Sequence, residues 1–336
     1  LLEMKKITLI FITFTFFSCN TKNEEFIISF GSCNKQYVPN VLWDEISKNN
    51  PKVWIWGGDN VYSDTDSMPK LRADYQKQWK QKGYKEFINS VDVLATWDDH
   101  DYGLNDGGVE FHKKKESQQE FLDFLKVAKD DIRRKQEGVY HSKIYKTAEG
   151  SVKVIVLDTR YFRSNLTVAA DKTKRYQPNK YGEGTVLGSK QWQWFEKELS
   201  NSNANFNIIV SSIQLLSYKH GFESWGNFPH EVDKIKNLIK VSKAKGVLML
   251  SGDRHISEFS GTQIKGLNFP LVDFTSSGLT HAYTGFKGEE NPNRIGEVIA
   301  DISFGILKLD FKNNKITMQM RGKSNVLQQE IIQSYN

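Results

Sequence analysis

Seven short apolar runs, separated by segments with helical periodicity, restrict most strongly how this chain can fold. Several of them are apolar throughout, which is typical of strands that are buried on both faces of a sheet. Strands that alternate with helices predict an α/β fold, in which layers of helices flank mixed β-sheets. We expect the strands at 26–30, 53–56, 91–96, 153–157, 207–210, 247–250 and 271–274.

Three helices and a hairpin complete the expected domain. A capping box at 117–120 predicts the start of one helix, and apolar residues at helical spacing around Phe195 and Ile235 predict two more. Asn313-Asn314 separates two strand-like runs and predicts a hairpin turn. The polar segment 164–188 predicts a long surface excursion.

The first residues have the pattern of a bacterial lipoprotein signal. Lys5 and Lys6 precede an apolar run at 7–17 that is too short to span a bilayer as a helix, and Cys19 follows Ser18 where a lipidated cysteine would stand. Ordinary signal cleavage beside an incidental cysteine is the alternative. The expected segments are a signal peptide, a tether and a single domain, at 1–18, 19–25 and 26–336.

The charge balance gives little support to a nucleic-acid partner. The formal net charge is +6, but the lysines are scattered, and 113–115 is the only tight basic run. Nucleic-acid binding would need a denser basic stripe with interleaved aromatic residues, so we expect no such partner. Cys33 is the only cysteine of the expected domain, so it cannot form an intramolecular disulfide there.

Polar residues follow four of the expected strands, where open α/β sheets commonly place their functional sites. The third cluster is the most informative, because five carboxylate or imidazole groups lie within nine residues. Like charges this close are unfavourable unless a cation neutralises them. The four clusters read GSCN at 31–34, GGDN at 57–60, DDHDYGLND at 98–106 and SGDRH at 251–255.

A glycine turn, a helix cap, a salt bridge or a solvated acidic loop could each explain one cluster alone. Together, four strand ends with oxygen, nitrogen and sulfur donors favour metal-assisted hydrolysis. The sequence has no dinucleotide-binding glycine motif, no Walker-type loop and no serine-hydrolase elbow, which argues against those classes of enzyme.

With these clusters in view, the chain resembles the PhoD-like alkaline phosphatases of the calcineurin-like metallophosphoesterase superfamily. The resemblance implies a layered metallophosphoesterase sandwich with metals at the carboxyl ends of its strands. Many relatives carry a β-rich domain before the first of these strands, and we expect none here. The motifs that carry the resemblance, in the family's order, are FGSCNKQ, WIWGGDNVYSDT, ATWDDHDYGLND, VIVLDTRYFR, LGSKQWQWFEKEL and LMLSGDRHISEF.

This resemblance implies a ferric ion and a calcium ion as cofactors. Cys33, Tyr62 and His255 would help to hold the iron, and Asp59 would bridge it to the second metal. Thiolate and phenolate groups are strong donors to a ferric ion, whereas calcium prefers carboxylate and amide oxygens.

The second cation would be held by Asp99, Asn105 and Asp253. By the same resemblance, His100 would lie near the departing oxygen of the substrate, and Arg160 would contact the phosphate. We therefore expect in-line hydrolysis of a small phosphate ester, in which a metal-held hydroxide attacks phosphorus.

Several alternatives stay open. The enzyme could prefer monoesters or diesters, it could be a phospholipase-like phosphodiesterase, or the chain could be a surface binding protein without activity. Tyr102, Tyr161, Phe162 and Trp225 could shape a pocket for the leaving group or could pack in the core, and Gln214 has no assigned role. We expect a monomer that is exported and lipid-anchored to a membrane of the cell envelope.

Overall fold

The computed structural model describes residues 25–335. The predicted signal segment, the predicted lipidation site Cys19 and nearly all of the predicted tether lie outside the described residues. None of the helices between residues 25 and 335 is long and apolar enough to cross a membrane.

One sheet contains six strands in the order β15-β14-β13-β1-β2-β3. Its strands β1, β2 and β3 are parallel, while β13, β14 and β15 continue the sheet as antiparallel neighbours on the other side of β1. The strands are β1 (Phe26–Gly31), β2 (Val53–Gly57), β3 (Asp92–Thr96), β13 (Phe304–Asp310), β14 (Lys315–Arg321) and β15 (Leu327–Ser334).

A second sheet contains seven strands in the order β12-β10-β11-β9-β8-β5-β4. Its central strands β11, β9, β8 and β5 are parallel. The strands are β4 (His141–Lys146), β5 (Ser151–Val156), β8 (Phe206–Val210), β9 (Val247–Ser251), β10 (Ser257–Thr262), β11 (Leu271–Ser276) and β12 (Arg294–Ile299).

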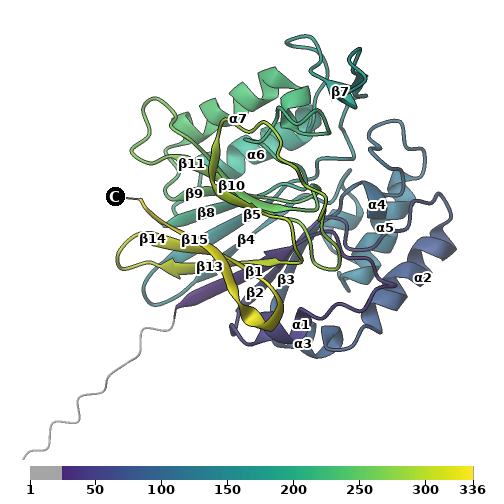
Figure 1. Cartoon of the computed structure of the whole chain (residues 1–336), viewed down its shortest axis with the longest axis horizontal. Helices are drawn as coiled ribbons and strands as arrows, with labels where there is room; N and C mark the ends of the chain where they lie inside the picture. Colours follow the sequence, from purple (N-terminus) through teal and green to yellow (C-terminus); the bar gives the residue numbers. More distant parts are fainter. Residues whose placement is uncertain (1–24, 336) are drawn as a thin grey trace, which may run out of the picture.

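Helices cover the outer face of each sheet (Figure 1). The helices α1 to α5 lie on the side of β1–β3, and α6 and α7 lie on the opposite side of the molecule. The helices are α1 (Trp43–Ser47), α2 (Met68–Trp79), α3 (Tyr84–Ser90), α4 (Asp99–Tyr102), α5 (Lys114–Phe124), α6 (Gly188–Ser200) and α7 (Pro229–Ser242). The short elements are η1 (Ile132–Arg134), η2 (Trp225–Asn227), η3 (Lys323–Asn325), β6 (Thr167–Val168) and β7 (Tyr176–Gln177).

Three buried apolar clusters hold these layers together. The cluster between the sheets joins Phe30 of β1 to Phe274 of β11, whose ring centroids lie 4.7 Å apart in an edge-on contact. A second cluster packs Trp43 of α1 against Trp54 and Trp56 of β2. The third lies between α6, α7 and the second sheet. Every layer therefore buries apolar surface against its neighbour, which is the dominant favourable contribution to folding.

The expected fold class, layered mixed sheets flanked by helices, is confirmed. All seven expected strands form, with boundaries within two residues of those predicted, and the hairpin forms between β13 and β14. The excursion at 164–188 contains only the two-residue strands β6 and β7 before α6.

The predicted capping box at 117–120 is wrong. Helix α5 begins at Lys114, so Ser117 lies inside the helix, where it is buried. The helix ends at Phe124, and Lys126 then adopts a positive φ of 55°.

The two sheets meet at the carboxyl ends of their parallel strands. An isolated parallel bridge joins Ser32, directly after β1, to Ser277, directly after β11. This contact brings the strand exits of both sheets into one place, where the polar clusters of the sequence follow β1, β2, β3 and β9.

Candidate metal centre

The polar residues after the four strands converge on one buried site. Their ligand atoms form three groups in which all atoms of a group lie within 4.8 Å of one another. Asp59 belongs to the first two groups and Asp99 belongs to the last two, so the groups overlap in a chain. The groups are Cys33, Asp59 and His255; Asp59, Asp99 and His100; and Asp98, Asp99 and Asp253.

Several of these donors have an unusual backbone conformation. Cys33, Asp59, Asp253 and His255 all have positive φ values, of 60°, 51°, 69° and 55°. Residues other than glycine rarely adopt this region, and such strain persists only where the surrounding structure enforces it. The conformations turn the chain sharply after β1, β2 and β9, where these donors stand.

Gly58 explains how the chain approaches so closely here. Its φ is +100°, and a Cβ at this position would lie 2.7 Å from the Cβ of Asp98 and 3.0 Å from that of Ser212. The backbone also connects the exits of the first two strands, because the amide of Asn34 donates to the carbonyl of Asp59 at 2.9 Å. A larger residue at 58 would therefore push two ligand-bearing loops apart.

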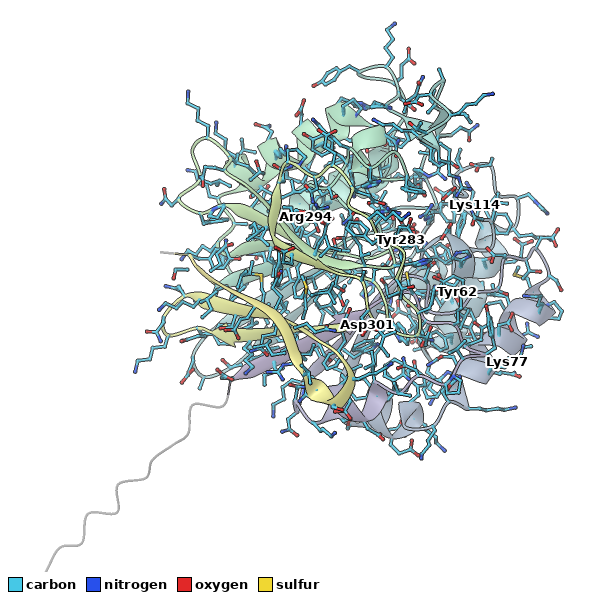
Figure 2. All side chains as sticks on the ribbon, in the orientation of Figure 1. Tyr62, Lys77, Lys114, Tyr283, Arg294 and Asp301 are labelled. Carbon is cyan, nitrogen blue, oxygen red and sulfur yellow. The ribbon has the colours of Figure 1, made fainter. Side chains whose placement is uncertain are left out.

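One half of the site combines a thiol, a phenol, a carboxyl and an imidazole. The Cys33 Sγ lies 3.4 Å from Asp59 Oδ2 and 3.1 Å from the Ser277 hydroxyl. The Tyr62 hydroxyl donates to Asp59 Oδ2 at 3.1 Å and lies 2.9 Å from His255 Nε2. In Figure 2, Tyr62 lies near one end of the sheets, and the β13–β14 turn, whose strands are labelled in Figure 1, lies at the other end.

The other half is built by the residues after β3. The Asp99 carboxylate accepts hydrogen bonds from the amides of His100 at 3.0 Å and Asp106 at 2.7 Å. His100 Nδ1 lies 2.8 and 2.9 Å from the two carboxylate oxygens of Asp64. Since a carboxylate can only accept, the Nδ1 proton points to Asp64, and the ring orientation is fixed. Asn105 is exposed and lines the cavity in front of these groups.

Arg160, predicted from the sequence to contact phosphate, has no exposed surface. Its guanidinium makes ion pairs with Asp98 and, at 2.5 Å, with Glu223, both of which are also buried. Arg163 binds the other oxygen of Glu223 at 2.9 Å. Arg160 does not line the cavity, so its geometry supports a role in holding Asp98, a member of the third donor group, rather than a contact with substrate.

Burial makes Asp59 and Asp253 difficult to ionise in the protein alone, whereas Arg160, His100 and the amide of Asp106 overcome the effect of burial at Asp99 and lower its pKa. Burial raises the pKa of Asp59 well above its ordinary value, and raises that of Asp253 to about 7 against the opposing effect of Arg254. Burial also raises the pKa of the Cys33 thiol to about 11. A cation among these donors would favour their ionised forms, which is the state that binds metal. The donor set and its electrostatics therefore fit bound metal ions.

The two histidines of the site have opposite properties. Burial lowers the pKa of His255 to about 4, which leaves a neutral ring that can donate its lone pair. Burial would also lower the pKa of His100, but Asp59, Asp64 and Asp99 overcome this and raise it to about 10. In the protein alone, His100 therefore carries a proton, whereas His255 is neutral and can offer a lone pair to a cation.

The donors open into a cavity of about 280 Å³. The cavity connects the buried carboxylates to solvent and is large enough for a phosphate group with part of an organic substituent. Its lining residues are Asp99, His100, Asn105, Asp106, Arg175, Phe222, Glu223, Asp253, Arg254, His255 and Tyr283.

Three residues beside the donors were missed by the sequence analysis. Asp64 orients His100, and the Ser277 hydroxyl accepts a hydrogen bond from the amide of His255 at 2.8 Å. The ring of His281 lies 4.4 Å from that of His255. Ser277 and His281 follow β11, so the rule applied to the other strand ends would also have found them.

Gln214, to which no role was assigned, is buried behind the donors. Its amide nitrogen donates to Glu258 at 2.9 Å and to Thr275 at 2.8 Å. It belongs to none of the three donor groups.

Comparison with known protein families now adds an independent line of evidence, since the PhoD-like phosphatases match residues 15–319 of the chain. The chain belongs to this family. The resemblance inferred from the sequence motifs is therefore confirmed. Alkaline phosphatase D of Bacillus subtilis (strain 168) is 23% identical over 301 residues, which cover 80% of this chain and 51% of that protein. The chain thus spans about half the length of this curated relative.

Solved structures show the same fold. The structure of PhoD has a TM-score of 0.75 at 16% identity and covers 93% of this chain and 70% of its own. A dimetal phosphatase from Danio rerio has a TM-score of 0.52 at 14% identity, covering 93% of this chain and 99% of its own. At these identities the likeness establishes the metallophosphoesterase-type fold.

Proposed function

We propose that this chain hydrolyses phosphate esters with the help of bound metal ions. The observation that carries the proposal is the chain of three overlapping donor groups, which share Asp59 and Asp99 and open into the cavity. A matched relative named alkaline phosphatase D and a structural neighbour named a dimetal phosphatase support the same reaction class.

Donor chemistry suggests how the ions would be distributed. The half with thiol, phenol and imidazole suits a ferric ion, and the half with carboxylates and an amide suits calcium or another divalent ion. When bound, such ions polarise phosphoryl oxygens and help to ionise water. The residues proposed for the iron are Cys33, Asp59, Tyr62 and His255, and those for the second ion are Asp59, Asp99, Asn105 and Asp253.

His100 is the proposed proton donor to the leaving oxygen. Because the Nδ1–H group donates its hydrogen bond to Asp64, the Nε2 position of the ring is the one left to serve the substrate. The ring lies on the cavity wall beside Asp99, so it can reach a group bound in front of the carboxylates. Loss of a general acid of this kind commonly costs about 10²- to 10⁴-fold in rate.

Arg160 is proposed as a positioning residue. It neutralises Asp98 within the buried wall, so that the neighbouring donors Asp99 and Asp253 keep their places without a further uncompensated charge.

Elemental analysis combined with hydrolysis assays tests the proposal. We expect iron and a divalent metal in the purified protein, and turnover of p-nitrophenyl phosphate or its bis ester that a chelator abolishes. The preferred ester separates monoesterase from diesterase activity. If the folded protein is supplied with both metals but binds neither and hydrolyses neither ester, the proposed activity is wrong. The chain would then be a binding protein with this fold.

Variants of two histidines sharpen this test. His100→Ala should reduce turnover by at least 100-fold with normal metal content. His112→Ala is the matched control, because His112 is exposed and does not line the cavity. Loss of metal from His100→Ala would assign the residue to the ligands instead.

Lipid anchoring at Cys19, export to the cell envelope and a monomeric state also remain proposals. Mass spectrometry of the membrane-extracted protein would show diacylglyceryl modification of Cys19, and the protein should lose membrane association when Cys19→Ala prevents it. Sedimentation analysis of the purified protein should give the mass of a single chain.

A further inference from the structure

The part of the cavity lining that is not made of donors differs in character from the metal-binding side. It presents two aromatic side chains, Phe222 and Tyr283, and two arginines, Arg175 and Arg254. Phe222 is 41% exposed and Tyr283 is 46% exposed. Large aromatic surfaces that are open to solvent in a functional cavity commonly serve recognition, because burying them on a ligand is favourable.

These are not the aromatic residues that the sequence suggested for this purpose. Tyr102, Tyr161 and Trp225 are buried in the apolar clusters, and Phe162 packs against one of them. None of the four lines the cavity. Their positions in the core leave Phe222 and Tyr283 as the aromatic residues of its wall.

Arg254 fixes the position of Phe222. Its guanidinium lies 4.2 Å from the centroid of the Phe222 ring, and it donates to both carboxylate oxygens of Glu289 at 2.9 Å. The Arg254 side chain is 9% exposed, and its Nε is buried without a hydrogen-bond partner among residues 25–335. The phenyl ring is thus held by a cation–π contact and keeps exposed surface toward the cavity.

Tyr283 is connected directly to the metal-binding side. Its amide donates to the carbonyl of His255 at 2.7 Å, and its ring packs edge-on against Phe286. Within the described chain its hydroxyl makes no hydrogen bond, so the ring and the hydroxyl are both available to a ligand. Figure 2 shows Tyr283 toward the same end of the sheets as Tyr62.

The charges of this wall argue against a second phosphate site. Arg254 is neutralised by Glu289, and Arg175 is neutralised by Asp106 at 2.6 Å. Glu223, which also lines the cavity, is neutralised from behind by Arg160 and Arg163. The wall therefore offers stacking surface rather than net positive charge, and this favours a planar organic group over an anionic one.

We propose that Phe222, Arg254 and Tyr283 form a leaving-group subsite that selects phosphate esters of alcohols with a planar π system, such as an aryl or heterocyclic ring. This inference rests on the proposed hydrolysis at the adjacent donors. Phosphate bound at the donors would place the ester oxygen beside His100 and the organic group against Phe222 and Tyr283.

Two esters matched in size and in alcohol acidity test the subsite. Benzyl phosphate has a planar ring, and cyclohexylmethyl phosphate has a puckered ring of similar volume. We expect the native chain to favour the benzyl ester by about ten-fold in kcat/KM, the effect of one to two aromatic contacts. Phe222→Leu and Tyr283→Leu should each lower this ratio several-fold with unchanged metal content.

Tyr218→Leu is the matched control, because Tyr218 is an exposed aromatic residue near Phe222 in the chain that does not line the cavity. This variant should keep the native ratio. A native ratio near one, or a ratio that neither cavity variant changes, would overturn the subsite.

The corresponding phosphonates separate failure of the subsite from failure of the proposed reaction. They cannot be hydrolysed, and their binding to the metal-loaded protein can be followed by calorimetry. If neither ester is hydrolysed but benzylphosphonate binds about ten-fold more tightly than cyclohexylmethylphosphonate, the proposed activity is wrong and the subsite stands. Equal binding of the two phosphonates overturns the subsite whatever the activity.

Discussion

Replacing Arg160 by methionine should destabilise the protein strongly while leaving the cavity wall in place. The guanidinium is fully buried and pairs with Asp98 and Glu223. Arg163 continues to neutralise Glu223 in the variant, so Asp98 becomes the uncompensated charge. Removing one partner of a buried ion pair typically costs about 3–5 kcal/mol.

This cost can be converted into a melting temperature. Unfolding entropy near the melting temperature is about 2.1 cal/mol/K per residue, which gives about 0.65 kcal/mol/K for roughly 310 residues. We therefore expect Arg160→Met to lower the Tm by about 5–8 °C. The scan is made with chelator present, because a bound cation would neutralise part of the Asp98 charge.

Two further variants control for the loss of arginine itself. Arg175→Met removes a half-exposed ion pair with Asp106, for which about 1 kcal/mol and at most about 2 °C are expected. Adding Asp98→Asn to Arg160→Met should recover part of the lost Tm, since the uncompensated charge is then absent. If Arg160→Met keeps the native Tm but loses 100-fold or more in kcat/KM, the arginine contacts substrate and the structural reasoning fails.

Three shorter predictions concern the rest of the site and the fold. Asp64→Asn should lower kcat by about 10- to 100-fold with little change in KM or metal content, because His100 loses its orienting carboxylate; Asp66→Asn, at an exposed position, should not. Gly58→Ala should cost well over about 1 kcal/mol and reduce metal content, whereas Gly288→Ala, with the same φ of +100° but no atom within 4 Å of its Cβ, should show only the conformational cost and keep its metals. Burial would raise the pKa of Asp74, but hydrogen bonds from Lys77 and Lys70 lower it to about 2, below the unfolded value of about 3.9. The ionised carboxylate therefore stabilises the folded chain above about pH 4, and this contribution is lost as the pH falls below that value. The difference in Tm between the native chain and Asp74→Asn should accordingly be largest above about pH 4 and become smaller at lower pH.

Each of the three has an outcome that contradicts it. Normal turnover of Asp64→Asn would mean that His100 needs no orienting partner. Equal Tm losses for the two glycine variants would show that the space around Gly58 is not tight. If the Tm difference between the native chain and Asp74→Asn stays constant across this pH range, the ionised Asp74 carboxylate does not stabilise α2.

Much of the fold was predictable because its strands are short, continuously apolar and followed by polar residues. That pattern predicted β1, β2, β3 and β9 and also identified Cys33, Asp59, Asp99 and His255 as neighbours in space. It worked because the carboxyl ends of parallel strands necessarily share one edge of a sheet. Whether these residues bind the predicted metals is still a prediction.

The roles of other residues depend on how deeply their side chains are buried, which a sequence motif does not show. Arg160 stands in a recognisable motif, but only the fold shows that Asp98 and Glu223 enclose its guanidinium. The same holds for Trp225 in the core and Phe222 at the cavity, three residues apart in the chain with opposite exposure. Local hydrophobicity is similar for both, so only the tertiary packing separates them.

The course of β1 has a geometric consequence for how this protein could be displayed on a surface. The strand, seen in Figure 1, begins at Phe26 and ends at Gly31, two residues before Cys33. The start of the strand and Cys33 therefore lie at its opposite ends, about 20 Å apart at the usual rise of a strand. Immobilisation through the residues that precede Phe26 would consequently attach the support at the end of β1 that is remote from Cys33. The donors would then lie on the unattached side of that strand, where dissolved substrates reach them.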